Sequence, residues 1–419
     1  MAAFDALLVK AGTGDPAAQY QVGHVHHLGL LDQPRDLERA KEWYERSAAS
    51  GHPDAMVNLA ILLLRDLPAA GGRKDAPGAA RWFERAAQGG DAQAALYLGR
   101  LLLAGEEGVD ADPKRGLAWI ERAADSGSAP AANALGVICM EGEFLPRNLE
   151  RAVRLYRQAA EEGEVEAVFN FGLCRLQGAG VDADVGDAFE LFRRAAKAGH
   201  AGAMHNLGVM FLQGRGVEAD ESIAQGWFLK AAETGEPAAL YEAAQSFRVG
   251  RGVERDPRRA ILLYKDAAER GFVEAQFSLG LMLAEGEGLD RPMPEEAEPW
   301  YRRAAAAGHA GAAYNLGVMF AKGLGVPVDA AAALEAFERA IDLGSVEALF
   351  SAGLACATGR PQDLVKAAAY ARLSMERDPA GKGRALLEKL APMMTDSQRE
   401  AARAAAAEKT RSFGSLKNK

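Results

Sequence analysis

Apolar and small residues recur along most of this chain with a period of 36 to 39 residues. A regular series of glycines marks the period. Four residues after each of these glycines stands an alanine, and nine residues after it stands a small residue, usually another glycine. The series consists of Gly14, Gly51, Gly90, Gly127, Gly163, Gly199, Gly235, Gly271, Gly308 and Gly344. Self-similarity at such a period predicts an array of stacked repeats rather than a set of independent domains.

Each repeat contains two apolar faces of helical period, and in several repeats a Gly-x-Gly-Val segment separates them, as at 178–181, 214–217 and 250–253. An aromatic residue usually stands seven positions before the next glycine of the series, and a pair of alanines often follows it. We therefore predict two helices and a turn, with the first turn glycine as a left-handed C-cap. After the turn, an aspartate such as Asp112, Asp184, Asp220 or Asp256 is expected to cap the second helix.

The alanine–glycine spacing, the Gly-x-Gly-Val turn, the aromatic position and the Ala-Ala-x-x-Gly ending together resemble the Sel-one-like repeat family, which is related to the tetratricopeptide repeats. The resemblance covers roughly four-fifths of the chain. It implies an all-α fold, a right-handed superhelical solenoid of helix-turn-helix repeats, with about ten units. It also implies that the first helix of each unit lines the concave side.

The repeats divide the chain into five segments. We expect a capping helix at 1–13, nine repeats at 14–343, a degenerate tenth repeat at 344–380, C-terminal capping helices at 381–409 and a flexible basic tail at 410–419. Ser397 and Glu400 have the spacing of a capping box, which is typical of a helix N-terminus.

Composition argues against several classes of protein. The 419 residues include 49 Lys and Arg against 58 Asp and Glu, a formal net charge of −9. Such a chain offers no basic field to a phosphate backbone, so we expect no nucleic acid partner. We also expect neither a membrane span nor a secretory signal, because no apolar run is long enough and the first residues lack a basic lead. Cys139, Cys174 and Cys356 lie in different repeats, which favours a reducing, cytoplasmic location.

Motifs for catalysis and cofactor binding are not found in the sequence, which contains no P-loop, no His-Glu-x-x-His and no Gly-x-Ser-x-Gly. We therefore expect no catalytic residue and no cofactor. The closely spaced His24, His26 and His27 are either metal ligands or a solvated cluster in the end repeat, and the second interpretation is favoured because no further ligand stands nearby. Three more histidines follow a glycine of the series, where the family often has histidine, and are interpreted as structural: His52, His200 and His309.

Two ladders of side chains run along the predicted first helices. Seven residues after the glycine stand the amides Asn58, Asn170, Asn206 and Asn315. Asparagine is a mediocre helix former, so these amides either hold a partner's backbone or carboxylate, or bond to the backbone of the neighbouring repeat. One position earlier stand Tyr20, Phe169, His205, Tyr241, Phe277, Tyr314 and Phe350. These rings either pack between repeats, which we favour, or anchor a partner.

The seventh repeat departs from the pattern. Glu242, Gln245 and Arg248 replace residues that are apolar or amides elsewhere, and their spacing puts them on one helix face. With Tyr241, and with His205 and Asn206 of the preceding repeat, they predict a polar patch that binds a partner in the concave groove. The alternative is a locally drifted repeat without a ligand.

The favoured function is a non-enzymatic scaffold or adaptor that binds peptide or protein partners in the groove, in bacterial signalling or complex assembly. The negative net charge predicts a long-range preference for basic partners. Some relatives rich in cysteine interact with beta-lactams and cell-wall material, so an enzyme or small-molecule binder of that kind is the alternative. A third possibility is a regulatory subunit that docks through the basic tail at 410–419. The oligomeric state is left open.

Overall fold

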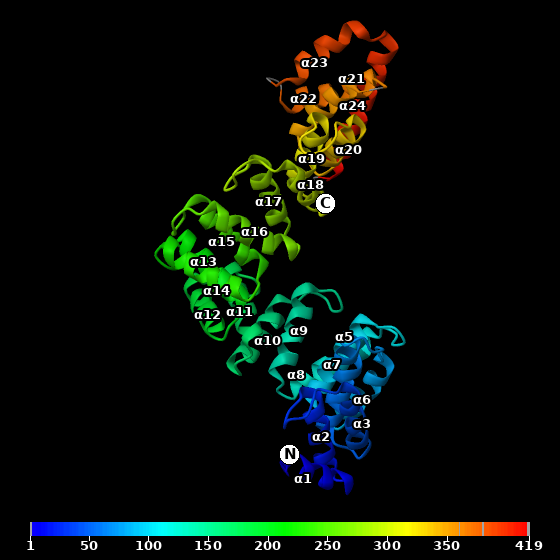
Figure 1. The fold of residues 1–419 in the computed structure, drawn as a ribbon, viewed down its shortest axis with the longest axis vertical. Helices are drawn as coiled ribbons and strands as arrows, with labels where there is room; N and C mark the ends of the chain where they lie inside the picture. The colour runs from blue at the N-terminus through cyan, green and yellow to red at the C-terminus, as the bar shows by residue number, and fades with distance from the viewer. Residues whose placement is uncertain (1, 360, 379–380, 417–419) are drawn as a thin grey trace. The chain divides into compact units, whose positions relative to one another are not determined.

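The computed structural model describes residues 2–359, 361–378 and 381–416. Over these ranges the chain is built from α-helices and contains no strand, which confirms the predicted all-α solenoid (Figure 1). None of the helices described has the length and apolar character that crossing a membrane requires.

The helices are α1 (Ala2–Gly12), α2 (Pro16–Leu28), α3 (Leu37–Ala49), α4 (Pro53–Ile61), α5 (Leu67–Ala69), α6 (Ala76–Gln88), α7 (Ala92–Ala104), α8 (Pro113–Asp125), α9 (Ala129–Glu141), α10 (Leu149–Glu161), α11 (Val165–Gln177), α12 (Val185–Lys197), α13 (Ala201–Gln213), α14 (Glu221–Glu233), α15 (Pro237–Val249), α16 (Pro257–Glu269), α17 (Val273–Glu285), α18 (Pro294–Ala306), α19 (Ala310–Lys322), α20 (Ala330–Asp342), α21 (Glu347–Thr358), α22 (Leu364–Arg377), α23 (Gly383–Leu390) and α24 (Asp396–Leu416). A π-helical turn, Leu62–Asp66, connects α4 to α5, and a 3₁₀ turn, Ala391–Met393, follows α23.

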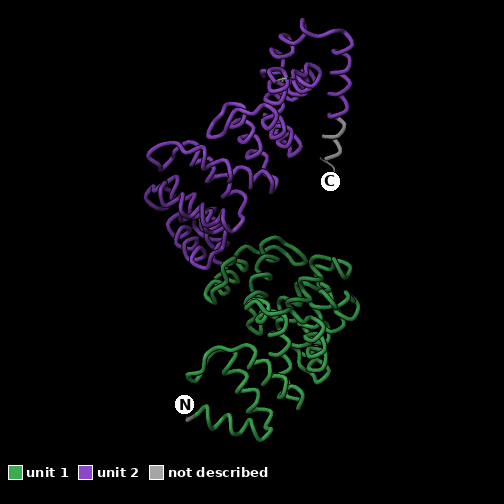
Figure 2. Tube along the Cα trace, turned by 45° about the vertical axis from the view of Figure 1, so that its right-hand side comes forward, with its two compact units in different colours: residues 1–203 green, residues 204–419 purple. Residues whose placement is uncertain are grey.

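Successive helix pairs form the repeats. The first helix of a pair packs against the second, and the second packs against the first helix of the next pair, as α9, α10 and α11 do. The chain divides into two compact units, residues 1–203 and 204–419, with the division inside α13 (Figure 2). Each unit is a run of stacked pairs in which every pair buries the apolar face of its neighbour.

The predicted caps are present at both ends of the helices. Asp184 starts α12, where its carboxylate accepts a hydrogen bond of 2.9 Å from the backbone N–H of Asp187. Asp112, Asp220 and Asp256 cap α8, α14 and α16 in the same way. Gly178 ends α11 with φ of 73°, a left-handed conformation that favours glycine, and its N–H donates to the carbonyl of Cys174. The caps confirm the predicted helix-turn-helix unit.

In several helix pairs a glycine of the first helix faces a buried ring of the second. A Cβ on Gly136 of α9 would lie 2.6 Å from Cε1 of Tyr156, and one on Gly280 of α17 would lie 2.8 Å from Cε1 of Tyr301. Both rings are almost fully buried. The small residue nine positions after each glycine of the series therefore lets the aromatic residue of the second helix approach the first helix closely.

Extra helices cover the two ends. At the N-terminus α1 packs against α2, and at the C-terminus α24 packs against α22. The capping box of α24 is formed by Thr395 and Gln398 rather than by Ser397 and Glu400 as expected, because the helix begins at Asp396. Within the tail expected at 410–419, α24 continues as a helix through Leu416. Residues 417–419 lie outside the described residues, and the flexibility of the tail stays a prediction.

Candidate interaction site

The rings of the first helices pack between neighbouring repeats. Phe169 stacks on His200 of the next repeat at 4.3 Å between ring centres, and Phe277 stacks on His309 at 4.2 Å. The two histidines cap the helices that they precede, because Nδ1 of each accepts a backbone N–H at 3.1 Å. Tyr20 stacks on His52 in the same position of the first repeat. These contacts support packing over partner anchoring, and they explain why histidine recurs after the glycine.

The predicted amides already have partners in the preceding repeat. Asn58 donates to the hydroxyl of Tyr20 at 3.1 Å, and Asn170 donates to the side-chain carbonyl of Asn133 at 3.0 Å. Asn315 hydrogen-bonds to Tyr301. The bonds go to side chains rather than to the neighbouring backbone that the packing interpretation expected. The amides therefore tie repeats together, and their contact with a partner stays a prediction.

Two members of the predicted patch on α15 make contacts within the protein. The Gln245 amide donates to the Tyr241 hydroxyl at 2.9 Å and accepts from the Tyr264 hydroxyl at 2.6 Å. Arg248 donates to Glu287 at 2.7 Å, in the turn after α17, and both side chains are about one-fifth exposed. Gln245 therefore joins the helices of its own repeat, while Arg248 joins that repeat to the next.

Glu242 is different from its neighbours on α15. Its side chain is half-buried, and among the described residues it makes neither a hydrogen bond nor an ion pair. Burial raises the pKa of Glu242, and the more distant charge of Arg251 opposes this only in part. A partly desolvated carboxylate without a partner is unfavourable, so a cation brought by a ligand would stabilise it. Glu242 is the candidate binding residue of the patch.

The remaining predicted patch residues lie on α13. The ring of His205 is half-buried with its centre 5.7 Å from that of Phe228 in α14, and burial lowers the pKa of His205. Asn206 is also half-buried, and it is not without a partner in the structure. At neutral pH His205 is therefore an uncharged part of the packing between the two helices.

The histidine cluster in the first repeat is not solvated, contrary to the favoured interpretation. His26 is only 4% exposed and packs edge-on against Phe4. His27 bridges the Tyr44 hydroxyl, at 3.2 Å from Nδ1, and the Asp66 carboxylate, at 3.1 Å from Nε2. Neighbouring helices cover these rings, which a single-helix pattern does not reveal. No group of three potential metal ligands was found in the described part of the chain.

The Tyr44–His27–Asp66 chain has the residue types of a catalytic relay but lacks access. Tyr44 is fully buried, so no substrate reaches its hydroxyl. The chain instead fastens the π-helical turn that carries Asp66 to the helices of the first repeat. Cys139, Cys174 and Cys356 are buried free thiols, and burial raises the pKa of Cys174 and of Cys356 to about 11. At neutral pH these thiols are almost entirely protonated and are therefore poor nucleophiles.

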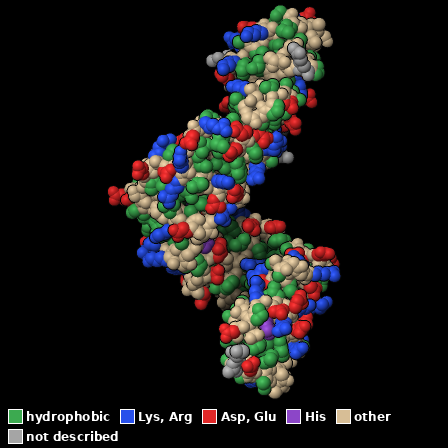
Figure 3. Space-filling model, viewed as in Figure 1, with side chains coloured by type: hydrophobic (Ala, Val, Ile, Leu, Met, Phe, Trp, Pro, Cys, Tyr) green, Lys and Arg blue, Asp and Glu red, His purple; other side chains and the backbone are tan. Residues whose placement is uncertain are grey.

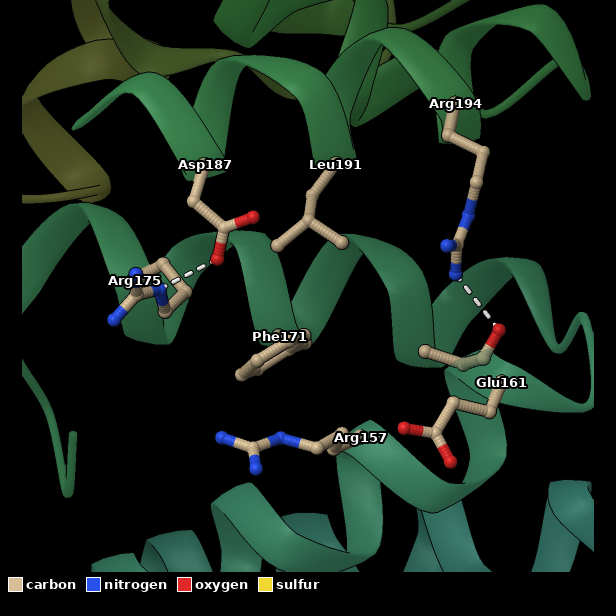
Figure 4. A pocket seen from close by; sticks show the side chains of 8 residues that line it. Arg157, Glu161, Phe171, Arg175, Asp187, Leu191 and Arg194 are labelled. Carbon is tan, nitrogen blue, oxygen red and sulfur yellow. Dashed lines mark hydrogen bonds and ion pairs between the residues drawn. The ribbon is translucent and has the colours of Figure 1, made fainter. Parts of the chain in front are cut away.

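A second candidate site was missed by the sequence reasoning. An open pocket of about 410 Å³ lies between α10, α11 and α12 in the first compact unit. It is lined by Arg157, Ala160, Glu161, Phe171, Arg175, Asp187, Leu191 and Arg194 (Figure 4). On the face of the molecule shown in Figure 3, Lys and Arg side chains alternate with Asp and Glu without forming a large patch of one sign.

Comparisons with known proteins agree with the repeat pattern. The model of the Sel1 repeat matches ten consecutive segments, at residues 16–52, 53–91, 92–128, 129–164, 165–200, 201–235, 237–272, 273–309, 310–345 and 346–378. A Sel1 repeat protein from Oxalobacter formigenes is 31% identical, covers 73% of this chain and 88% of its own, and has a TM-score of 0.56. The protective antigen c5321 of uropathogenic Escherichia coli, which displays an SLR fold, is 25% identical over 97% of this chain and 94% of its own, with a TM-score of 0.55. Comparison with curated proteins found no match.

Proposed function

Because the chain belongs to the Sel1 repeat family, whose members are generally protein-interaction scaffolds, we propose that it is a non-enzymatic scaffold that binds a basic segment of a protein partner through Glu242. Both solved relatives described above are bacterial. The proposal therefore extends to a role in bacterial signalling or complex assembly. It also includes the cytoplasmic location expected from the cysteine pattern, which cell fractionation checks.

The unpaired carboxylate of Glu242 carries the proposal. At the same position of other repeats stand the amides Asn58, Asn170 and Asn315, each bonded to a side chain of the repeat before it. Glu242 has no such contact among the described residues, so its two oxygens remain acceptors for an incoming group. A lysine or arginine of a partner supplies both the charge and the hydrogen-bond donors that this half-buried carboxylate lacks.

Long-range charge supports the same class of partner. The net charge of −9 attracts basic segments during encounter, and the attraction weakens as salt increases. Long-range attraction depends on the net charge and is weakened equally by the loss of any one carboxylate, whereas a direct contact is weakened only by the loss of Glu242. The test therefore compares the affinity of variants that lack different carboxylates.

The test is a selection of random peptides on the immobilised full chain, followed by calorimetry with the enriched peptides. We expect enrichment of lysine and arginine at one peptide position and loss of about tenfold or more in affinity on Glu242→Gln, because a hydrogen bond to a charged group contributes about 1.5–3 kcal/mol. The substitution keeps the size of the side chain, so circular dichroism should be unchanged.

Glu254→Gln is the matched control. Glu254 is an exposed carboxylate in the turn before α16, and its substitution removes the same single charge. If both variants lose affinity equally, the attraction is only long-range and the site at Glu242 is wrong. Enrichment of acidic or purely apolar peptides would also contradict the proposal.

A further inference from the structure

The tryptophans of this chain all occupy one position of the repeat. They stand eight residues before the next glycine of the series and are Trp43, Trp82, Trp119, Trp227 and Trp300. Each is half-buried on a second helix, and a cation three residues later lies over its ring, at 4.6 to 5.7 Å from the ring centre. In these five repeats, this position of the second helix therefore holds an indole in a cation–π contact.

The pocket in the first compact unit lies where this indole is missing. In α12 the position is occupied by Leu191, and Arg194 takes the place of the cation three residues later. Without a ring to cover, Arg194 donates to the carbonyl of Ala160 at 2.7 Å. In the first repeat Trp43 packs against the cluster that contains Val22, which corresponds to Phe171 here. Phe171 and Leu191 form the apolar lining of the resulting pocket.

The charged groups around this lining fit a ring with one polar atom. The Arg157 guanidinium lies 5.4 Å from the centre of the Phe171 ring and makes no ion pair among the described residues. Glu161 lines the same pocket and also lacks an ion pair or hydrogen bond in the part of the chain described. Figure 4 shows Leu191 pointing from α12 toward Phe171, with Arg157 and Glu161 on the α10 side. Arg157 can therefore cover a ring, while Glu161 accepts its N–H or O–H.

A free anion fits the pocket less well. The charge of Arg175 is already paired, at 2.9 Å with Asp184 and at 2.6 Å with Asp187. Asp187 and Glu161 add two carboxylates to the lining, which repel an anion.

From these contacts we propose that the pocket is a socket for a tryptophan or tyrosine side chain presented by a protein partner. The ring occupies the place that the chain's own indole fills in five other repeats, against Phe171 and Leu191. The exposed Arg157 moves onto the outer face of the ring, and the polar atom of the ring bonds to Glu161. The identity of the occupant as a protein rests on the proposed scaffold function. The socket and Glu242 lie in different compact units, so each is tested without the other.

The probe is N-acetyl-5-fluorotryptophanamide, titrated into the full chain and followed by ¹⁹F NMR. We expect saturable binding with a dissociation constant on the order of millimolar, as for a single side-chain fragment. Leu191→Trp supplies an internal indole beneath Arg194, so it should raise the melting temperature and reduce probe binding by about tenfold or more. Leu155→Trp makes the same change at the same position of the preceding repeat, outside the lining, and should leave probe binding unchanged.

Arg157→Gln keeps the proposal testable if the tryptophan variant does not fold. Arg157 is exposed, so the variant should fold normally, and loss of its cation over the ring should weaken probe binding by about two- to fivefold. No probe binding by the unmodified chain, or unchanged binding by both Leu191→Trp and Arg157→Gln, would overturn the socket. Displacement of the probe by inorganic phosphate would show an anion site and overturn it as well. Neither result would affect peptide binding at Glu242.

Discussion

Replacing Gly280 with alanine tests the close contact between α17 and α18. The added Cβ would lie 2.8 Å from Cε1 and 2.9 Å from Cδ1 of Tyr301, well inside ordinary carbon–carbon contact. Tyr301 is only 2% exposed, so its ring has little room to move away. Either the ring or α17 has to shift, and the packing of α17 against α18 is disturbed.

Two opposing contributions set the size of the effect. Overpacking a well-packed core costs about 1–3 kcal/mol, while alanine in a helix interior is favoured over glycine by about 0.5–1 kcal/mol. The balance is a loss of up to about 2.5 kcal/mol in the free energy of unfolding, with a mid-range value of about 1 kcal/mol. For a unit of this size the melting temperature should fall by roughly 2–4 °C at the mid-range value and by at most about 10 °C.

Gly226→Ala is the matched control, because a Cβ at Gly226 of α14 meets nothing within 4 Å. It should instead stabilise the chain by about 0.5–1 kcal/mol through helix propensity alone. Thermal unfolding followed by circular dichroism gives both midpoints, and hydrogen exchange of α17 and α18 shows where the change acts. If Gly280→Ala raises the midpoint as much as Gly226→Ala does, the close contact has no energetic role and the reasoning is refuted.

Three further perturbations test the contacts between repeats. Burial lowers the pKa of His309, so below about pH 6.5 the unfolded chain binds a proton at this histidine more readily than the folded chain does. The free energy of unfolding should therefore fall as the pH falls from 7 to 5. His309→Asn keeps a capping side chain and should make the unfolding midpoints measured over this pH range less dependent on pH. Arg248→Ala should lower the free energy of unfolding by about 1–3 kcal/mol, because Glu287 loses one of its ion-pair partners. A double-mutant cycle with Glu287→Gln should show that the two effects are coupled. Independent effects would contradict an energetic role for the Arg248–Glu287 ion pair. Asn170→Ala should lower the free energy of unfolding by about 1–3 kcal/mol, because the buried amide of Asn133 loses its hydrogen-bond donor. In urea unfolding, the double variant with Asn133→Ala should lose less stability than the sum of the two single variants.

The helical repeat was largely predictable because its signals are local. Asp184 caps α12 through an N–H three residues away, and Gly178 ends α11 by its own backbone conformation. A capping box is equally local, but Thr395 and Gln398 have the same three-residue spacing as the expected pair, Ser397 and Glu400. The structure forms the box with Thr395 and Gln398.

The candidate sites were less predictable. The sequence indicated that Glu242, Gln245 and Arg248 share one helix face, and all three lie on α15. It did not indicate that Gln245 is bonded to Tyr264, 19 residues on, or that Arg248 is paired with Glu287, 39 residues on. The regular position of the tryptophans gave a sequence signal for the pocket beside Leu191, because that position holds leucine instead of tryptophan in this repeat. The leucine alone does not show a pocket, since the neighbouring helices decide whether the space is open.

Period, helix ends and the small residues inside each pair follow from the amino-acid pattern, because helical spacing and caps involve residues within about one or two turns of each other. Which polar side chains remain available to a partner follows from the stacking of one repeat on the next. Stacking supplies the bonds of Asn58 and Asn170, buries His26, and leaves Glu242 without a partner among the described residues. These outcomes depend on side chains that are distant in the sequence but a few ångströms apart in the folded chain.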